Sequence, residues 1–168
     1  MSTDDPDAAA KTGKRSGARR ASPKSGRRRA REFAVQGLYE WLISGADAGV
    51  VDAHVREQPG FEKCDVAHFD LLLHGVIREA ADIDAVLAAH VDRKTAHLSP
   101  VEHAILMIGV HELRHCLDIP YRVAINEGVE LAKSFGGTDG HKYVNGVLDK
   151  AAAELRRAEV EANRARRG

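Results

Sequence analysis

Four arginines within five residues, Arg27, Arg28, Arg29 and Arg31, are the densest source of chemistry in this sequence of 168 residues. Guanidinium groups bind phosphates through paired N–H donors, and their flat faces stack on bases. The run leads into an amphipathic segment that extends to Ile43, with apolar residues at helical spacing. We therefore expect a positioned polyanion-binding element at the start of a helix. Composition leaves open whether the polyanion is RNA, DNA or a membrane surface.

The segment His111-Glu112-Leu113-Arg114-His115 matches the HExxH pattern of zinc proteases. In such enzymes both histidines bind zinc from one face of a helix and the glutamate is the general base. No third ligand is evident, since Glu130 follows too closely and no strand for a peptide substrate is predicted. With nine histidines in the chain, three fixed positions arise readily by chance. We predict no catalytic residue, no metal site and no cofactor, and we expect partly exposed helix residues near the surface.

A glycine-rich turn over residues 136–140 precedes His141, Lys142 and Tyr143. Free amides at a helix start attract phosphate, while a lysine adds charge and a tyrosine offers a stacking face. The turn lacks the strand and the GKS or GKT sequence of a nucleotide-binding loop. A plain helix cap and a ligand contact are equally good interpretations. Tyr39 lies in a second apolar stripe and also has two interpretations, as a core residue or as part of a partner-binding surface.

The net charge of zero conceals an asymmetry, because residues 1–31 are strongly basic and residues 32–150 are acidic. A basic arm on an acidic body favours contact between the arm and polyanions. No apolar run approaches the length of a membrane span and no secretory signal is present, which predicts a cytoplasmic protein without membrane contact. Cys64 and Cys116 form no metal-binding or disulfide pattern, so we expect two buried free thiols.

The remaining pattern predicts an all-α fold of six to seven helices. Apolar residues recur at helical spacing from Asp65 to about His90, with a break near Arg78, and Ser99-Pro100-Val101-Glu102 fits a capping box. The apolar run over residues 104–110 should lie at the buried centre. We expect a disordered basic extension over residues 1–26, a helical RNA-binding domain over residues 27–158 and a flexible tail over residues 159–168.

Four stretches in this order resemble the NusB family of transcription antitermination factors. They are RRRAREFAVQGLYEW from Arg27, LSPVEHAIL from Leu98, IPYRVAINEGVELAKSFG from Ile119 and DGHKYVNGVLDKA from Asp139. They span about residues 27–155. One departure is HELRH, whose second histidine is not a family feature, and another is the long basic extension.

The resemblance implies two small packed helical bundles and no catalysis. It implies binding to the boxA element of nascent RNA together with a small-subunit ribosomal protein, called NusE in this role. The pair would join an antitermination complex on RNA polymerase that supports ribosomal RNA transcription. The positions that contact RNA in the family match the arginine run and the start of the last of the four stretches in this sequence. The positions that contact the partner protein match two further residues. The RNA-binding set is Arg27, Arg28, Arg29, Arg31, Asp139, Lys142 and Tyr143, and the partner-binding set is Tyr39 and Glu102.

Three alternatives remain open at this point. NusB-like domains precede certain RNA methyltransferases, but this chain has no following α/β domain with a glycine-rich cofactor loop. A zinc protease built on HELRH would require stoichiometric metal. A structural protein could form a homodimer through the surface around Tyr39, and such a homodimer is also possible when the family's partners are absent.

Overall fold

The computed structural model describes residues 23–92, 94–135 and 140–167, and these form eight α-helices and two short 3₁₀ helices with no strand. The all-α prediction is confirmed, with more helices than the six to seven expected. The elements are α1 (Pro23–Ser44), α2 (Ala48–Arg56), η1 (Phe61–Lys63), α3 (Val66–Arg78), α4 (Ala80–Ala88), η2 (Thr95–His97), α5 (Pro100–His115), α6 (Tyr121–Phe135), α7 (Gly140–Leu155) and α8 (Arg157–Arg167). None of the described helices is long and apolar enough to cross a membrane.

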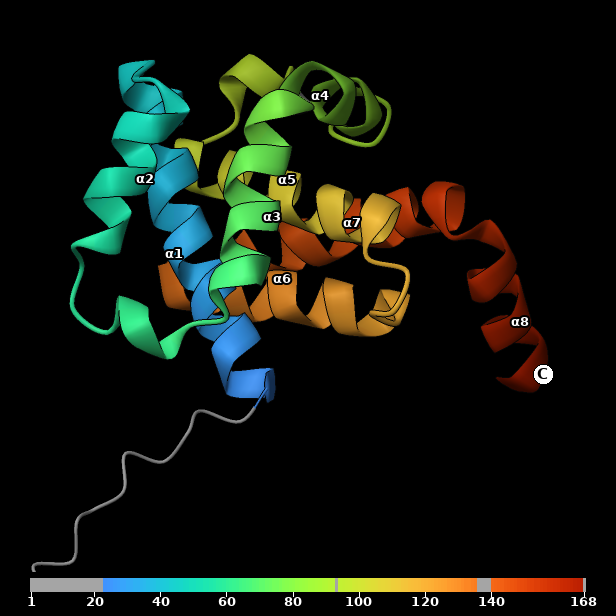
Figure 1. The fold of residues 1–168 in the computed structure, drawn as a ribbon. Helices are drawn as coiled ribbons and strands as arrows, with labels where there is room; N and C mark the ends of the chain where they lie inside the picture. The colour runs from blue at the N-terminus through green and yellow to red at the C-terminus, as the bar shows by residue number, and fades with distance from the viewer. Residues whose placement is uncertain (1–22, 93, 136–139, 168) are drawn as a thin grey trace, which may run out of the picture.

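Two packed groups of helices share one continuous core (Figure 1). In the first group α1 packs against α2 and α3, and in the second α5 packs against α4, α6 and α7. The two groups meet where α1 and α3 contact α5. Every residue from His103 to Leu113 on α5 is buried, which confirms the burial predicted for residues 104–110 and extends it at both ends. Helix α5 is therefore the centre around which the functional surface is built.

Local sequence signals explain where the helices begin and end. The Ser99 hydroxyl accepts a hydrogen bond from the Glu102 amide at 3.2 Å, and Pro100 occupies the first turn of α5, which confirms the predicted cap. The break predicted near Arg78 separates α3 from α4. At the end of α1, Gly45 adopts the left-handed conformation, with φ of 66°, that most side chains avoid.

Close approach of three helices depends on glycine. A Cβ on Gly109 of α5 or on Gly128 of α6 would lie 2.6 or 2.7 Å from the Leu148 side chain of α7. Real Cβ atoms do not approach other atoms so closely, so both positions favour glycine, which has no side chain. The leucine fills the space at the α5–α6–α7 junction.

Both predicted ends of the domain differ from the structure. Helix α1 begins at Pro23 rather than after residue 26, because proline is well suited to the first turn of a helix. The remainder of the predicted disordered extension, residues 1–22, lies outside the described residues. The tail predicted as flexible from residue 159 is instead part of α8, where Val160 is buried and the Glu159 carboxylate accepts a hydrogen bond from the Tyr121 amide at 2.9 Å.

A candidate nucleic-acid interface

The arginines of α1 divide into exposed and buried positions. The side chains of Arg27 and Arg28 are 39% and 45% exposed, whereas that of Arg31 is 4% exposed. Arg27 donates from both terminal nitrogens to Asp118 Oδ2 at 3.3 Å, just beyond the end of α5. Arg29 is half-buried. The helical spacing thus directs the guanidinium groups of Arg27 and Arg28 toward solvent and that of Arg31 into the core.

Arg31 forms a buried ion pair with Glu112 of α5. Its Nε and Nη2 donate to the two carboxylate oxygens at 2.7 and 2.9 Å. Burial tends to raise the pKa of Glu112, but contacts with the His68 imidazole and the Arg31 guanidinium outweigh this effect and hold the pKa below its ordinary value. Burial likewise tends to lower the pKa of Arg31, and the Glu112 carboxylate reverses that effect. Both groups are therefore charged at neutral pH.

Glu127 of α6 connects this buried pair to the surface. It accepts two hydrogen bonds from Arg28, from Nε at 3.2 Å and from Nη2 at 3.1 Å, and its Oε2 lies 3.7 Å from Arg31 Nη1. These hydrogen bonds raise the pKa of Arg28 above its ordinary value. A network of two arginines and two glutamates consequently fixes the start of α1 against α5 and α6.

Sequence reasoning missed Glu112 and Glu127 as the groups that orient the arginines. Glu112 was expected to be partly exposed as a member of HELRH, and that prediction is wrong because its side chain is 2% exposed. His111 of the same motif is also buried, while His115 is 41% exposed as expected. A carboxylate in the second half of an otherwise apolar helix was the available signal, since a buried charge requires a partner.

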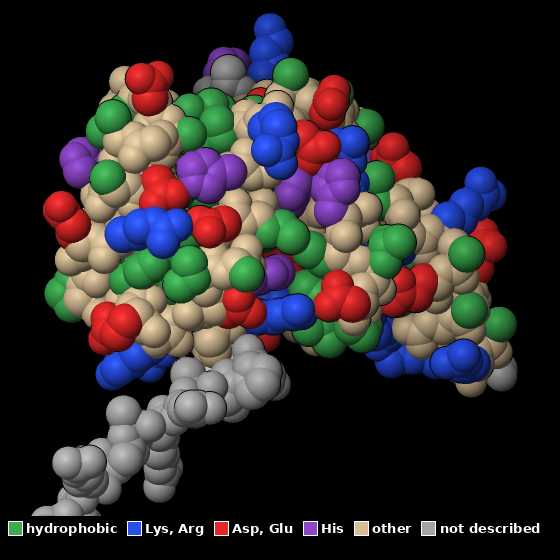
Figure 2. All heavy atoms as spheres, in the orientation of Figure 1, with side chains coloured by type: hydrophobic (Ala, Val, Ile, Leu, Met, Phe, Trp, Pro, Cys, Tyr) green, Lys and Arg blue, Asp and Glu red, His purple; other side chains and the backbone are tan. Residues whose placement is uncertain are grey.

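A groove of about 700 Å³ runs beside this network between α1 and α6. Acidic and basic side chains both line it, and Figure 2 shows the two kinds intermixed over the face in view. Among its lining residues are the charged side chains Arg27, Arg28, Arg31, Lys133, Asp118, Glu127 and Glu130 and the apolar side chains Ile119, Pro120, Val123 and Val129. The groove therefore combines the exposed cations Arg27 and Arg28 with acidic and apolar side chains.

An apolar hollow of about 240 Å³ lies farther along α1, lined by Val35, Gln36, Tyr39, Val101 and Phe135. The side chain of Tyr39 is 42% exposed, so it belongs to the surface rather than to the core. The hollow joins α1 to the start of α5 and the end of α6. We name it the Tyr39 hollow.

The start of α7 lies beside the same region. A Cβ on Gly140 would stand 3.4 Å from Glu102 Oε1, which places the first residue of α7 against the start of α5. Lys142 is exposed, and the half-buried Tyr143 donates from its hydroxyl to Asp92 Oδ1 at 3.2 Å. Asp139, also predicted to contact RNA, lies outside the described residues. The structure thus places the start of α7 beside Glu102 and ties Tyr143 to the segment after α4.

A second buried arginine, unrelated to the surface, holds the end of α5. Arg156, between α7 and α8, donates to the carbonyl oxygens of Leu113, Cys116 and Ile119 at 2.7, 2.8 and 3.1 Å. It also donates to Glu159 at 2.6 Å. Positive charge and donors are favourable at the carbonyl end of a helix. Arg156 therefore fixes the segment that carries Asp118 and leads into α6.

Residues 28–153 match the family model described as the NusB family. The chain belongs to the NusB family. The transcription antitermination protein NusB of Ralstonia nicotianae is 60% identical over 145 residues, covering 86% of this chain and 94% of that protein. The protein of the same name from Bordetella pertussis is 58% identical over 147 residues, covering 85% and 96%.

Solved NusB structures share the fold. Thermotoga maritima NusB ("T. maritima NusB") matches with a TM-score of 0.70 at 26% identity, covering 80% of this chain and 96% of that one. NusB in a crystal structure of antitermination factors NusB and NusE with double-stranded RNA matches with a TM-score of 0.65 at 26% identity, covering 74% and 94%.

Membership of the NusB family confirms the predicted family and the prediction that the chain is not an enzyme, because its relatives are transcription antitermination proteins. HELRH accordingly has no protease role: its glutamate is bound by Arg31 within the core and faces no open site. The methyltransferase alternative also loses its support. The individual RNA-binding and partner-binding residues remain predictions.

Proposed function

We propose that this protein binds the boxA element of nascent RNA together with NusE. The pair then joins an antitermination complex on RNA polymerase that supports ribosomal RNA transcription. The observation that carries the proposal is the groove between α1 and α6, where Arg27 and Arg28, two of the arginines predicted to contact RNA, are exposed and are oriented by acidic partners. The crystal structure of NusB and NusE with double-stranded RNA supports the same two partners.

Arg28 is the arginine best prepared for a phosphate. Glu127 engages its Nε and Nη2, and the N–H groups of Nη1 remain directed away from that pair. The carboxylate therefore fixes the guanidinium plane in advance, which reduces the entropy lost when RNA binds. Arg27, held by Asp118 and 39% exposed, extends the same cationic edge.

Arg31 has a different role in this proposal. Its guanidinium is bonded to Glu112 and lies 3.7 Å from Glu127, with almost no exposed surface. We propose that Arg31 contributes to RNA binding by positioning Glu127 and the start of α1. Arg29, Lys142, Tyr143 and Asp139 stay in the proposed RNA-contacting set.

The Tyr39 hollow is the proposed contact for NusE. An exposed aromatic ring that lines an apolar hollow is typical of protein interfaces, and Glu102 follows Val101 of the hollow in the chain. The same surface could pair two copies of the chain in the absence of NusE. Light scattering of Tyr39→Ala with and without NusE tests this role, with Leu71→Ala on the exposed face of α3 as the matched control.

The main test is fluorescence anisotropy with labelled boxA RNA and a scrambled RNA, with and without NusE. The Arg27→Ala/Arg28→Ala variant is compared with Arg56→Ala/Arg78→Ala, which removes the same charge from exposed positions outside the groove. At about 1.5 kcal/mol for each charge-assisted hydrogen bond, the first variant should lose roughly 100-fold in affinity.

Salt dependence separates phosphate contacts from an indirect effect. If both arginines contact phosphates, the slope of log affinity against log salt should become shallower by about 1.4 in Arg27→Ala/Arg28→Ala. The control should keep the wild-type slope. Equal binding to boxA and scrambled RNA, unaffected by NusE, would contradict the proposed function.

A further inference from the structure

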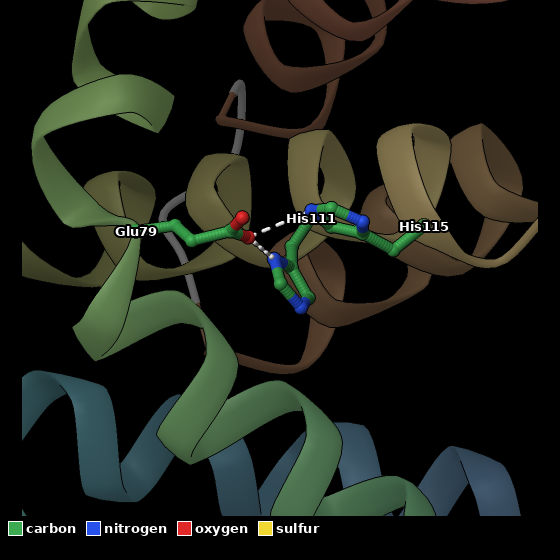
Figure 3. A group of neighbouring side chains, drawn as sticks. All are labelled: Glu79, His111 and His115. Carbon is green, nitrogen blue, oxygen red and sulfur yellow. Dashed lines mark ion pairs between the residues drawn. The ribbon is translucent and has the colours of Figure 1, made fainter.

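Glu79, His111 and His115 point toward one another across the junction of α3, α4 and α5 (Figure 3). Glu79 follows the last residue of α3, and the two histidines lie one turn apart on α5. Glu79 Oε2 is 3.1 Å from His111 Nδ1 and 2.7 Å from His115 Nε2. One ligand atom from each residue lies within 4.8 Å of the others. A single carboxylate oxygen thus faces two imidazole nitrogens.

Hydrogen bonds within the described part of the chain leave two of these atoms unsatisfied. Glu79 Oε2 and His111 Nδ1 are both buried and have no hydrogen-bond partner there. Both nitrogens nonetheless lie within ion-pair distance of that oxygen. Buried polar atoms without partners are rare in folded proteins, and a cation between them would satisfy both.

The donor set suits a divalent transition metal. Two imidazole nitrogens and one carboxylate oxygen, with an open position left for water, are a ligand combination that zinc accepts. Ligand atoms about 2.1 Å from a tetrahedral zinc lie roughly 3.4 Å from one another. The Glu79 oxygen lies 3.1 and 2.7 Å from the two nitrogens, so these side chains would have to move apart by less than about 1 Å. The spacing of the histidines by four residues places both rings on the same face of α5.

The packing around His111 holds its ring in the required orientation. The Nε2 edge rests against Gly75 of α3, where a Cβ would stand 2.5 Å from that nitrogen. Nδ1 consequently faces Glu79. The positive charge of the nearby Arg114 disfavours a metal ion at this position, and the negative charge of the Glu79 carboxylate offsets that effect.

We propose that Glu79, His111 and His115 form a zinc-binding site that ties the α3–α4 junction to α5. The sequence offered both histidines, and the fold supplies the third ligand that the sequence did not reveal. The site is one for binding rather than catalysis, because Glu112, the base of an HExxH enzyme, is held by Arg31. Since Glu112 follows His111 directly, zinc would also stabilise the helix that anchors the arginine network.

A second cluster provides an internal control. Asp52, Asp70 and His74 also lie close enough to hold a metal. In contrast to the proposed site, Arg56 forms ion pairs with both aspartates, and His74 contacts Asp52. This cluster is already neutralised by an internal cation, so we expect it to bind zinc weakly.

The test uses the full chain, purified without an affinity tag and freed of metal with a chelator. Equimolar zinc should bind, measured by elemental analysis after gel filtration, and zinc at about 100 times its Kd should raise the Tm by roughly 5–10 °C. Cobalt should give the visible absorption bands of a tetrahedral site. His115→Ala and Glu79→Gln should abolish all three effects, whereas His74→Ala should retain them.

Two results would overturn the proposal. One is the absence of stoichiometric zinc on a protein whose circular dichroism shows it to be folded. The other is zinc binding that persists in both His115→Ala and Glu79→Gln. Because His115 is 41% exposed, its replacement should leave the Tm of the metal-free protein nearly unchanged, so loss of zinc cannot be attributed to unfolding. Neither result depends on RNA or NusE.

Discussion

The buried ion pair between Arg31 and Glu112 gives the sharpest prediction. Both side chains are at most 4% exposed and are joined by two hydrogen bonds of 2.7 and 2.9 Å. Glu112→Leu removes the carboxylate and leaves the guanidinium buried, with only the more distant Glu127 as a counterion. Breaking one side of a buried pair costs about 3–5 kcal/mol of unfolding free energy. For a chain of this size, that corresponds to a fall in Tm of roughly 6–20 °C.

A double variant distinguishes a buried pair from simple loss of packing. Arg31→Met/Glu112→Leu removes both charges and replaces them with apolar side chains. Such replacements are often neutral, so we expect the double variant to lose less stability than Glu112→Leu alone. Urea unfolding followed by circular dichroism at pH 7 measures the four free energies of the cycle. Arg157→Met/Glu161→Leu is the matched control, because that pair on α8 is 80% and 65% exposed and should contribute under about 1 kcal/mol.

The pH dependence follows from the lowered pKa of Glu112. A carboxyl group whose pKa is lower in the folded state stabilises the fold above its ordinary pKa of 4.5, and this contribution is lost as the pH falls through the folded value. The stability difference between wild type and Glu112→Leu should therefore stay constant from pH 8 to 5 and shrink below about 4.5. A loss under about 1 kcal/mol at pH 7, or a double variant as unstable as the sum of the single variants, would refute the reasoning.

Three further predictions concern the packing around α5 and α7. Arg156→Ala should destabilise the protein by about 3 kcal/mol in urea unfolding, because several buried carbonyls lose their donor, and destabilisation below 1 kcal/mol would argue against the cap. Gly128→Ala should cost about 2 kcal/mol because its Cβ would meet Leu148, whereas Gly146→Ala, with open space around it, should gain up to about 1 kcal/mol. Burial raises the pKa of Cys116 to about 11, so its thiol should resist iodoacetamide at pH 8 until urea unfolds the chain, and rapid labelling of the native protein would contradict this.

The elements of the fold were largely predictable because their signals are local. The Ser99 cap, Pro100 and the apolar run of α5 act within one or two turns of a helix, and the break near Arg78 is of the same kind. Helix α8 escaped prediction because its sequence is strongly polar. Its position depends on the burial of Val160 and on the hydrogen bond from the Tyr121 amide to Glu159. These two residues are 38 positions apart in the sequence.

The sequence by itself determined the all-helical class, the family and the concentration of arginines at the start of α1. Only the tertiary structure decided what each arginine does. Arg28 and Arg31 are three residues apart and chemically identical, yet one is a surface group and the other a buried ion. Their partners lie 99 and 81 residues away, and the third ligand of the proposed zinc site comes from the turn between α3 and α4. Periodicity fixes which face of a helix is apolar, but the identity of a buried charge's partner depends on how separate helices pack.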